Sequence, residues 1–216
     1  MKEEMRQKFI EIFGNNRVLF DEPMSQHTTF RIGGPADVFV MPENYEQIRE
    51  VLRLCKEEKL PFFVLGNGSN LLVSDSGYRG VIIQMDRNME EIRLDGEEIH
   101  ACAGALLSSV AVAARNASLT GFEFAGGIPG TIGGAAVMNA GAYGGELKDV
   151  LKEVTVMTRE GEILTIPAEK MEMGYRTSII KTAGYLVLEA VISLKKGDEE
   201  AIRATMKDLS ERRTEK

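Results

Sequence analysis

The chain has 216 residues, of which 44% are hydrophobic and 27% are charged, a balance typical of a globular protein with its own core. Its formal net charge of −7 gives no general attraction to nucleic acid or to an anionic membrane surface. The longest weakly polar stretch, residues 101–114, is shorter than the roughly 20 apolar residues of a membrane span. Cys55 and Cys102 could form at most one disulfide bridge and stand in no metal-ligand motif, so we expect a reducing, cytoplasmic location and no metal.

The first part of the chain predicts an α/β layer. Apolar residues at helical spacing predict a helix over residues 1–13, and a strand is expected over 36–41. A helix with Asn44 as its N-cap follows, and then a short buried strand over 61–65 and another strand over 80–84.

The pattern changes after Gln84, where hairpins replace the strand and helix alternation. Residues 85–216 predict the following elements in order: a hairpin over 91–94 and 98–103, an Ala-rich helix over 106–118, a second hairpin over 150–158 and 162–166, a strand over 185–194 and a charged helix over 198–216.

The 22 glycines are unevenly placed, and one group follows the strand over 61–65. Gly66 and Gly68, with Asn67, Ser69 and Asn70, offer backbone N–H groups that can bind a pyrophosphate. The spacing is not a Rossmann fingerprint, because Leu71 stands where a third glycine is required. A tight turn that binds nothing is the alternative interpretation.

Nine further glycines lie within residues 121–145. Backbone with so few side chains needs something to pack against it, such as a flat ligand or another helix. We expect a short helix over 133–139, with Thr131 near its cap and its N-terminal N–H groups facing phosphate. Two separate glycine-rich loops favour a nucleotide-type cofactor.

A third candidate is Arg176, which lies in a segment without helical or strand periodicity. A guanidinium suits bidentate binding of a carboxylate or phosphate, although a plain surface arginine is the commoner case. His27, His100 and Cys102 stand in no catalytic pattern.

Four segments occur in order along nearly the whole chain: TTFRIGGPADVFV, VLGNGSNLLVSD, EFAGGIPGTIGGAAVMNAGAYGGEL and GYRTS. In these segments the chain resembles the UDP-N-acetylenolpyruvoylglucosamine reductase family, flavoenzymes of bacterial peptidoglycan synthesis. The resemblance implies an α+β fold of the vanillyl-alcohol-oxidase type, with FAD between two α/β subdomains that we expect at residues 1–84 and 85–216. It also implies a cytoplasmic, monomeric oxidoreductase that serves cell-wall biogenesis, cell shape and cell division.

The resemblance further implies the reaction and its residues. NADPH reduces a noncovalently bound FAD, which then reduces the enolpyruvyl group of a nucleotide-sugar substrate to give UDP-N-acetylmuramate. Arg176 matches the arginine that stabilises the enolate, and Tyr175 would lie beside the substrate. The cofactor-binding residues implied are Gly66, Asn67, Gly68, Ser69, Asn70, Leu71, Gly127, Ile128, Pro129, Gly130, Thr131, Gly133 and Gly134.

One departure from the family is visible. Its members continue past the equivalents of Arg212 and Arg213 into a domain with a PSAGS-type segment and a later glutamate, which this sequence lacks. We therefore expect the chain to be the FAD-binding portion, without full activity alone. The alternatives are another FAD-dependent oxidase or dehydrogenase of the same fold, and a noncatalytic module.

Overall fold

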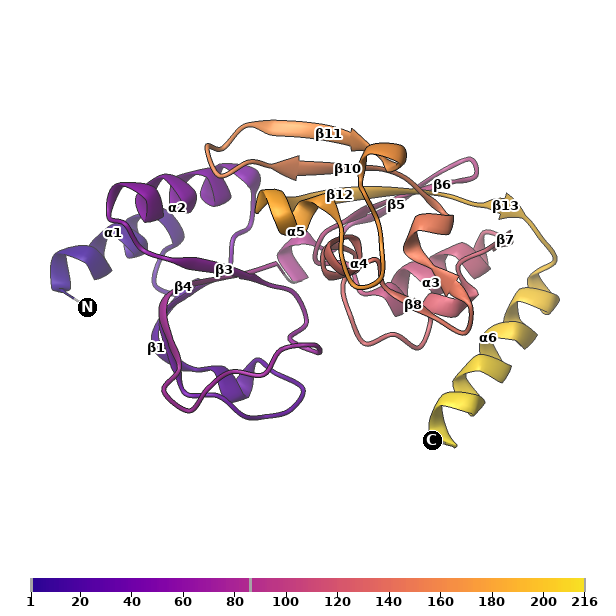
Figure 1. Cartoon of the computed structure of the whole chain (residues 1–216), viewed down its shortest axis with the longest axis horizontal. Helices are drawn as coiled ribbons and strands as arrows, with labels where there is room; N and C mark the ends of the chain where they lie inside the picture. Colours follow the sequence, from indigo (N-terminus) through magenta and orange to yellow (C-terminus); the bar gives the residue numbers. More distant parts are fainter. Residues whose placement is uncertain (1, 86, 216) are drawn as a thin grey trace.

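The computed structural model of the chain describes residues 2–85 and 87–215, which form two main sheets flanked by helices (Figure 1). The strands of the first sheet are β1 (Val18–Pro23), β2 (Pro35–Val40), β3 (Phe62–Leu65) and β4 (Tyr78–Gln84). Their order is β1-β2-β4-β3, in which β4 is parallel to β2 and β3, and β1 is antiparallel to β2. The helices α1 (Glu3–Phe13) and α2 (Tyr45–Glu57) belong to the same part of the chain as this sheet.

Helix α2 forms as its sequence predicts. The Asn44 side chain accepts a hydrogen bond from the Gln47 N–H at 2.9 Å, which satisfies one of the free donors at the helix start. The apolar stripe of α2 is buried, and it consists of Ile48, Val51, Leu52, Leu54 and Cys55. This confirms the helix expected after Asn44, and it gives parallel strands β2 and β3 their crossover connection.

The edges of the first sheet differ from expectation. The prediction of a buried strand at β3 is wrong, because β3 is an edge strand and only Leu65 is buried in it. Strand β1 was not predicted at all. Its sequence VLFDEP lacks a regular apolar alternation, and Asp21 interrupts the extended backbone with a φ of 54°.

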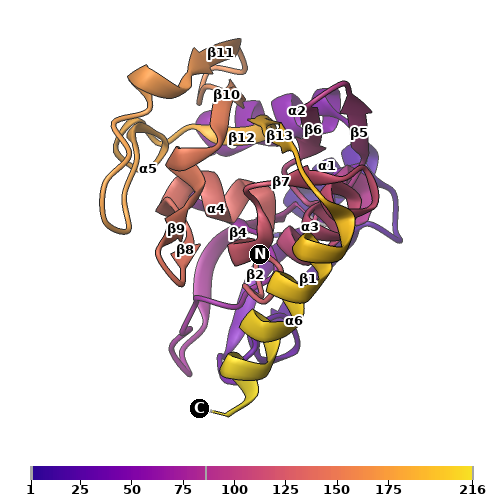
Figure 2. The same cartoon turned by 90° about the vertical axis from the view of Figure 1, so that its right-hand side faces the viewer.

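The second sheet is antiparallel throughout. Its strands are β5 (Ile92–Asp95), β6 (Glu98–Cys102), β10 (Leu151–Met157), β11 (Ile163–Pro167) and β12 (Leu186–Ser193), in the order β11-β10-β12-β6-β5. Both expected hairpins are therefore present. Helices α3 (Leu107–Asn116) and α4 (Ile132–Met138) pack against this sheet, and α6 (Glu199–Thr214) lies along the outside of α3 (Figure 2).

Short elements complete the chain. They are the strands β7 (Leu119–Thr120), β8 (Gly141–Ala142), β9 (Gly145–Glu146) and β13 (Lys195–Lys196), the helix α5 (Ile179–Ala183), and the 3-10 turns η1 (Met24–Gln26), η2 (Arg87–Met89), η3 (Glu123–Ala125), η4 (Leu147–Asp149) and η5 (Ala168–Lys170). Within the described ranges, no helix has the length and apolar character needed to cross a membrane.

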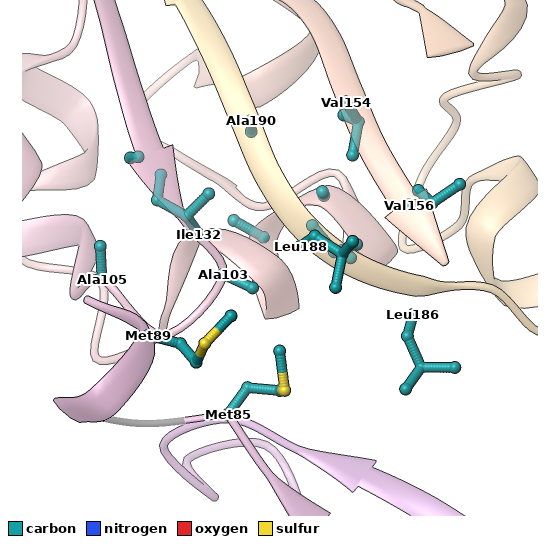
Figure 3. Close-up of a cluster of buried hydrophobic side chains, with 14 of the residues drawn as sticks. Met85, Met89, Ala103, Ala105, Ile132, Val154, Val156, Leu186, Leu188 and Ala190 are labelled. Atoms are coloured by element: carbon teal, nitrogen blue, oxygen red, sulfur yellow. The ribbon is translucent and has the colours of Figure 1, made fainter. Parts of the chain in front are cut away.

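The main hydrophobic core runs through both sheets without interruption. Figure 3 shows the region where the two sheets meet, with Met85 and Met89 beside Ala103 and Leu188. Flexible thioether side chains suit such an irregular junction, because they fill gaps that branched residues cannot follow. The molecule is thus a mixed α+β fold with two sheets joined by one core.

Candidate functional site

The loop that follows β3, residues 66–71, folds back against the segment that follows η1. Gly68 has a φ of +64°, and an added Cβ would overlap the carbonyl oxygen of His27. The N–H of Thr29 donates to the Gly68 carbonyl oxygen at 3.2 Å, which holds the two segments together. Only glycine meets both requirements, a left-handed backbone and direct backbone contact.

The N–H groups of this loop point to no partner in the fold. Among the hydrogen bonds of the described residues, none uses the N–H of Asn67, Gly68, Ser69 or Asn70. Unpaired N–H groups on successive residues of a glycine-rich turn form a concave donor surface for an anion. The arrangement has the chemistry expected of a pyrophosphate-binding loop.

The second glycine-rich segment meets the first directly. An added Cβ at Gly66 would lie 2.5 Å from the Thr131 hydroxyl oxygen. The Asn67 side-chain Nδ2 donates to the Pro129 carbonyl oxygen at 3.3 Å. The two loops therefore lie in direct contact, and we call the pair the cradle and define it as residues 66–71 and 127–131.

The start of α4 differs from expectation. The short helix is present and Thr131 is its N-cap, with its hydroxyl oxygen accepting from the Gly134 N–H at 3.3 Å. However, the Ile132 N–H donates to the Ala105 carbonyl oxygen at 2.8 Å, and the Gly133 N–H donates to the Ala103 carbonyl oxygen at 2.9 Å. These donors are already paired, so the expectation that the helix N-terminus faces phosphate is wrong in this structure.

Gly133 packs closely against residue 103 instead. An added Cβ there would approach the Ala103 Cβ and carbonyl oxygen at 3.0 Å. Gly134, in contrast, is exposed, and the nearest atom to an added Cβ would be the Thr131 hydroxyl oxygen at 3.6 Å. Gly133 thus lets α4 pack against the turn after β6, and Gly134 leaves the helix backbone exposed on the opposite side.

Arg176 lies at the tip of a tight turn, residues 174–177, which we call the arginine turn. The Gly174 N–H donates to the Thr177 carbonyl oxygen at 3.1 Å, and the Thr177 N–H returns the bond at 3.4 Å. Arg176 has a φ of +57° and is exposed, and its guanidinium lies 5.6 Å from the ring centroid of Tyr175. Tyr175 is itself 87% exposed.

The arginine turn borders a cavity of about 450 Å³. Its other lining residues come from the segment after α4, and they include Asn139, Glu146 and Lys148. Glu146 forms an ion pair with Lys148 at 2.5 Å. Its carboxyl pKa is lowered by the Lys148 and Asn139 hydrogen bonds, and to a smaller degree by the positive charge of Arg176.

Sequence reasoning missed Asn139, Glu146 and Lys148 as members of this site. The signal was weak, because a buried asparagine and a surface ion pair carry no characteristic spacing. The juxtaposition of residues 139–149 with residues 174–177 depends on tertiary structure.

His27 and the two cysteines are engaged within the fold. The His27 Nε2 lies 2.8 Å from Glu22 Oε1, and its ring stacks on Phe39 with centroids 4.0 Å apart. Burial raises the pKa of the Cys55 thiol to about 12, and burial together with the Glu189 and Glu91 charges raises that of Cys102. Across residues 2–85 and 87–215, no group of His, Cys, Asp or Glu has an arrangement suited to a metal ion.

Comparison with known proteins adds independent findings. A family model described as an FAD binding domain matches residues 36–167. The chain is 49% identical over 215 residues to the UDP-N-acetylenolpyruvoylglucosamine reductase of Alkaliphilus metalliredigens, covering 100% of the chain and 71% of that protein. It is 50% identical over 214 residues to that of Geobacillus kaustophilus, covering 99% and 70%.

Solved structures agree in fold. The crystal structure of the reductase from Thermus caldophilus matches with a TM-score of 0.78 and 32% identity, over 92% of this chain and 69% of that one. The p-cresol methylhydroxylase structure matches with a TM-score of 0.67 at 17% identity, over 90% and 43%, which shows a shared fold alone.

Proposed function

Because the chain belongs to the UDP-N-acetylenolpyruvoylglucosamine reductase family, we propose that it binds FAD noncovalently. The reaction that it serves is the NADPH-dependent reduction of UDP-N-acetylglucosamine enolpyruvate to UDP-N-acetylmuramate, a step of peptidoglycan synthesis. The observation that carries this proposal is the meeting of two glycine-rich loops at Gly66 and Thr131, with unpaired N–H groups beside them. The chain spans 68–71% of the length of its first relatives, and we propose FAD binding as the part of the reaction that it supplies.

The cradle suits a dinucleotide in both shape and chemistry. The unpaired N–H groups of residues 67–70 would bind the pyrophosphate, because backbone donors neutralise phosphate oxygens without a bulky side chain. The backbone of the second loop would accept the flat ring system near Gly130, where an added Cβ would have no atom closer than 3.7 Å, whereas Gly127 lies against the Arg213 side chain of α6. The proposed contacts are Gly66, Asn67, Gly68, Ser69, Asn70, Leu71, Gly127, Ile128, Pro129, Gly130, Thr131 and the exposed Gly134, with Gly133 needed for close packing.

When bound, FAD would supply hydride transfer to the enolpyruvyl double bond. We assign Arg176 the task of holding the negative charge that develops on the substrate next to its carboxylate, since a fixed guanidinium stabilises such charge in the transition state. Tyr175, stacked under that guanidinium and exposed, would form a side of the substrate site.

Two further parts of the proposal concern organisation and location. We propose residues 1–84 and 85–216 as the two subdomains that contact FAD, because the first sheet ends at Gln84 and the second begins at Ile92. We propose the bacterial cytoplasm as the location, where the free thiols of Cys55 and Cys102 would stay reduced.

The visible spectrum of the purified chain tests FAD binding. We expect a bound-flavin spectrum, or saturable binding when FAD is added to the apoprotein, and weaker binding of riboflavin, which lacks the pyrophosphate. A chain that binds riboflavin as tightly as FAD would contradict the role of residues 67–70. Bleaching by NADPH under anaerobic conditions then tests electron transfer.

Acid precipitation separates this proposal from an oxidase with covalent FAD. We expect the flavin to stay in solution, because His27 is held by Glu22 and Phe39 and the Cys102 thiol has a raised pKa. Flavin that remains in the pellet would favour the oxidase alternative, and a chain that never binds flavin would favour the noncatalytic module.

Arg176→Ala tests the assignment of the reaction site. In a complete enzyme that carries this substitution, we expect unchanged FAD affinity and a loss of roughly 10²- to 10³-fold in substrate-dependent NADPH oxidation, the usual effect of removing one transition-state charge partner. Arg93→Ala, which removes an exposed arginine on β5, is the control and should change neither. Equal rates in the Arg176 variant and the parent would remove this residue from the mechanism.

A further inference from the structure

We propose that Asn139 is a positioning residue for Arg176, holding the arginine turn at a set place relative to the cradle. The functional part of this inference rests on the proposed role of Arg176. The structural part does not, because it concerns contacts within the chain itself.

The Asn139 side chain joins three segments. Its Nδ2 donates to Glu146 Oε2 at 3.0 Å and to the Gly174 carbonyl oxygen at 3.2 Å. Its Oδ1 accepts from the Lys148 N–H at 3.0 Å. One amide group therefore connects the end of α4 and the turn at η4 with the first residue of the arginine turn.

The position of Asn139 makes these bonds matter energetically. The residue is only 3% exposed and has a left-handed backbone (φ 44°, ψ 61°) as the C-cap of α4. A buried amide that loses a hydrogen-bond partner costs free energy, because the unpaired polar group stays out of water. The three bonds of Asn139 therefore stabilise the arrangement in which the arginine turn lies against α4. Ser178 adds a second connection nearby, since its hydroxyl donates to the Val137 carbonyl oxygen at 3.0 Å.

Helix α4 carries this constraint to the cradle. Its N-cap, Thr131, lies against Gly66, and its C-cap, Asn139, bonds to Gly174. Seven helical residues span about 10 Å at 1.5 Å per residue. Helix α4 therefore begins at Thr131, the last residue of the cradle, and ends at Asn139, whose side chain bonds to the arginine turn.

The charges around Asn139 act in the same direction. The Glu146 carboxylate that receives the amide hydrogen is paired with Lys148, and it attracts Arg176 across the cavity. Glu146, which Asn139 holds by a hydrogen bond, therefore lines the same cavity as Arg176.

The experiment compares Asn139→Gly with Thr182→Ala in the full chain. Glycine keeps the left-handed backbone and removes only the amide, whereas Thr182→Ala removes an exposed hydroxyl bond within neighbouring α5 as a control. We expect hydrogen exchange of the Thr177 N–H to rise roughly tenfold in Asn139→Gly, the factor for about one lost hydrogen bond. The Arg176 Nε–H resonance should show a lower heteronuclear NOE, while FAD affinity stays within about twofold.

A pair of further variants tests the contact chemically. Asn139→Asp places a carboxylate against Glu146 and should disorder the turn more than glycine does. Adding Glu146→Gln to Asn139→Asp restores a donor and acceptor pair, and it should recover part of the Arg176 signal. A merely structural role would instead raise exchange evenly over the molecule and would show no such rescue.

Two outcomes would overturn the inference. They are an unchanged Thr177 exchange rate in Asn139→Gly, and a rise that is the same in β4 as in the arginine turn. In turnover assays of a complete enzyme that carries these substitutions, Asn139→Gly should lower kcat and have no further effect in an Arg176→Ala background. Failure of FAD binding would count against the proposed function alone, since the exchange and resonance measurements need no cofactor.

Discussion

Two glycines with nearly the same backbone angle differ in what surrounds them. Gly68 in the cradle has a φ of +64° and an added Cβ would overlap the His27 carbonyl oxygen, whereas Gly96 in the β5–β6 turn has a φ of +62° and nothing within 4 Å of an added Cβ. The conformational requirement is therefore shared, and the steric one belongs to Gly68 alone.

Gly68→Ala and Gly96→Ala separate these effects. Each substitution should lower the unfolding free energy by about 1–2 kcal/mol, because alanine is strained in a left-handed backbone. Gly68→Ala must also displace the segment of residues 27–29. In urea unfolding we expect the Gly68 variant to lose at least about 1 kcal/mol more than the Gly96 variant. FAD titration should show weaker binding only for Gly68→Ala. Equal losses of unfolding free energy in the two variants would mean that residues 27–29 move aside at little cost.

Burial of titratable groups, with Cys55 and Tyr45 as the two largest cases, makes the stability of the chain fall at alkaline pH. Burial raises the pKa of the Cys55 thiol from 9.0 to about 12, and it raises that of the Tyr45 hydroxyl from 10.0 to about 12, aided by the Cys102, Glu189 and Glu91 charges. The folded chain therefore keeps these protons over a range in which the unfolded chain releases them. Their contribution to stability is complete below about pH 9 and is lost between pH 9 and 12.

The urea midpoint should therefore fall as pH rises from 9 towards 12. Tyr45→Phe removes one of the two groups and should make the decline between pH 10 and 12 shallower, with little change at pH 7. Cys55 should resist alkylation at pH 8 until the chain unfolds. A midpoint that stays level up to pH 12 would contradict the burial of both groups.

At the scale of single elements, α2 owes its start to one side chain. Asn44→Ala removes the acceptor of the Gln47 N–H and should cost about 1 kcal/mol of unfolding free energy. Asn44→Ser keeps an acceptor at the same place and should stay within a few tenths of the parent. Thermal or urea unfolding measures both, and equal losses in the two variants would assign the effect to something other than the cap.

Elements with strong local signals were predicted correctly, and those set by context were missed. Helix α2 combines a cap with an apolar stripe, and the β5–β6 hairpin carries an Asp-Gly turn, so neighbouring residues suffice to define them. Strand β1 and helix α5 have no such signals. Strand β1 forms because β2 offers it an unpaired edge, and α5 forms because Ile180 packs into the core and Gly184 ends it in a left-handed conformation.

At the scale of the whole molecule, one core connects both sheets, so they should unfold together. The junction at Met85 and Met89 is buried and continuous with the cores on either side (Figure 3). Contacts of this kind couple neighbouring units into one cooperative transition.

FAD should raise the stability of this single unit. At a free concentration 100 times its Kd, a ligand that binds only the folded chain adds about 2.7 kcal/mol, which for a chain of this size corresponds to roughly 5–11 °C in Tm. We expect calorimetry to show one transition for the apoprotein and one at higher temperature with FAD. Two transitions without FAD would mean that the residues around Met85 do not couple the halves.

The sequence alone determined the α+β class, the two glycine-rich loops, the family and the main helices and hairpins, because these depend on local periodicity, capping and residue types that neighbours in the chain display. Tertiary structure decided how the loops are used. It joined Gly66 to Thr131 across 65 positions, paired the N–H groups at the start of α4 with residues 103–105, and bonded Asn139 to the arginine turn. Such contacts depend on the packing of distant segments around a shared core, which no local pattern encodes.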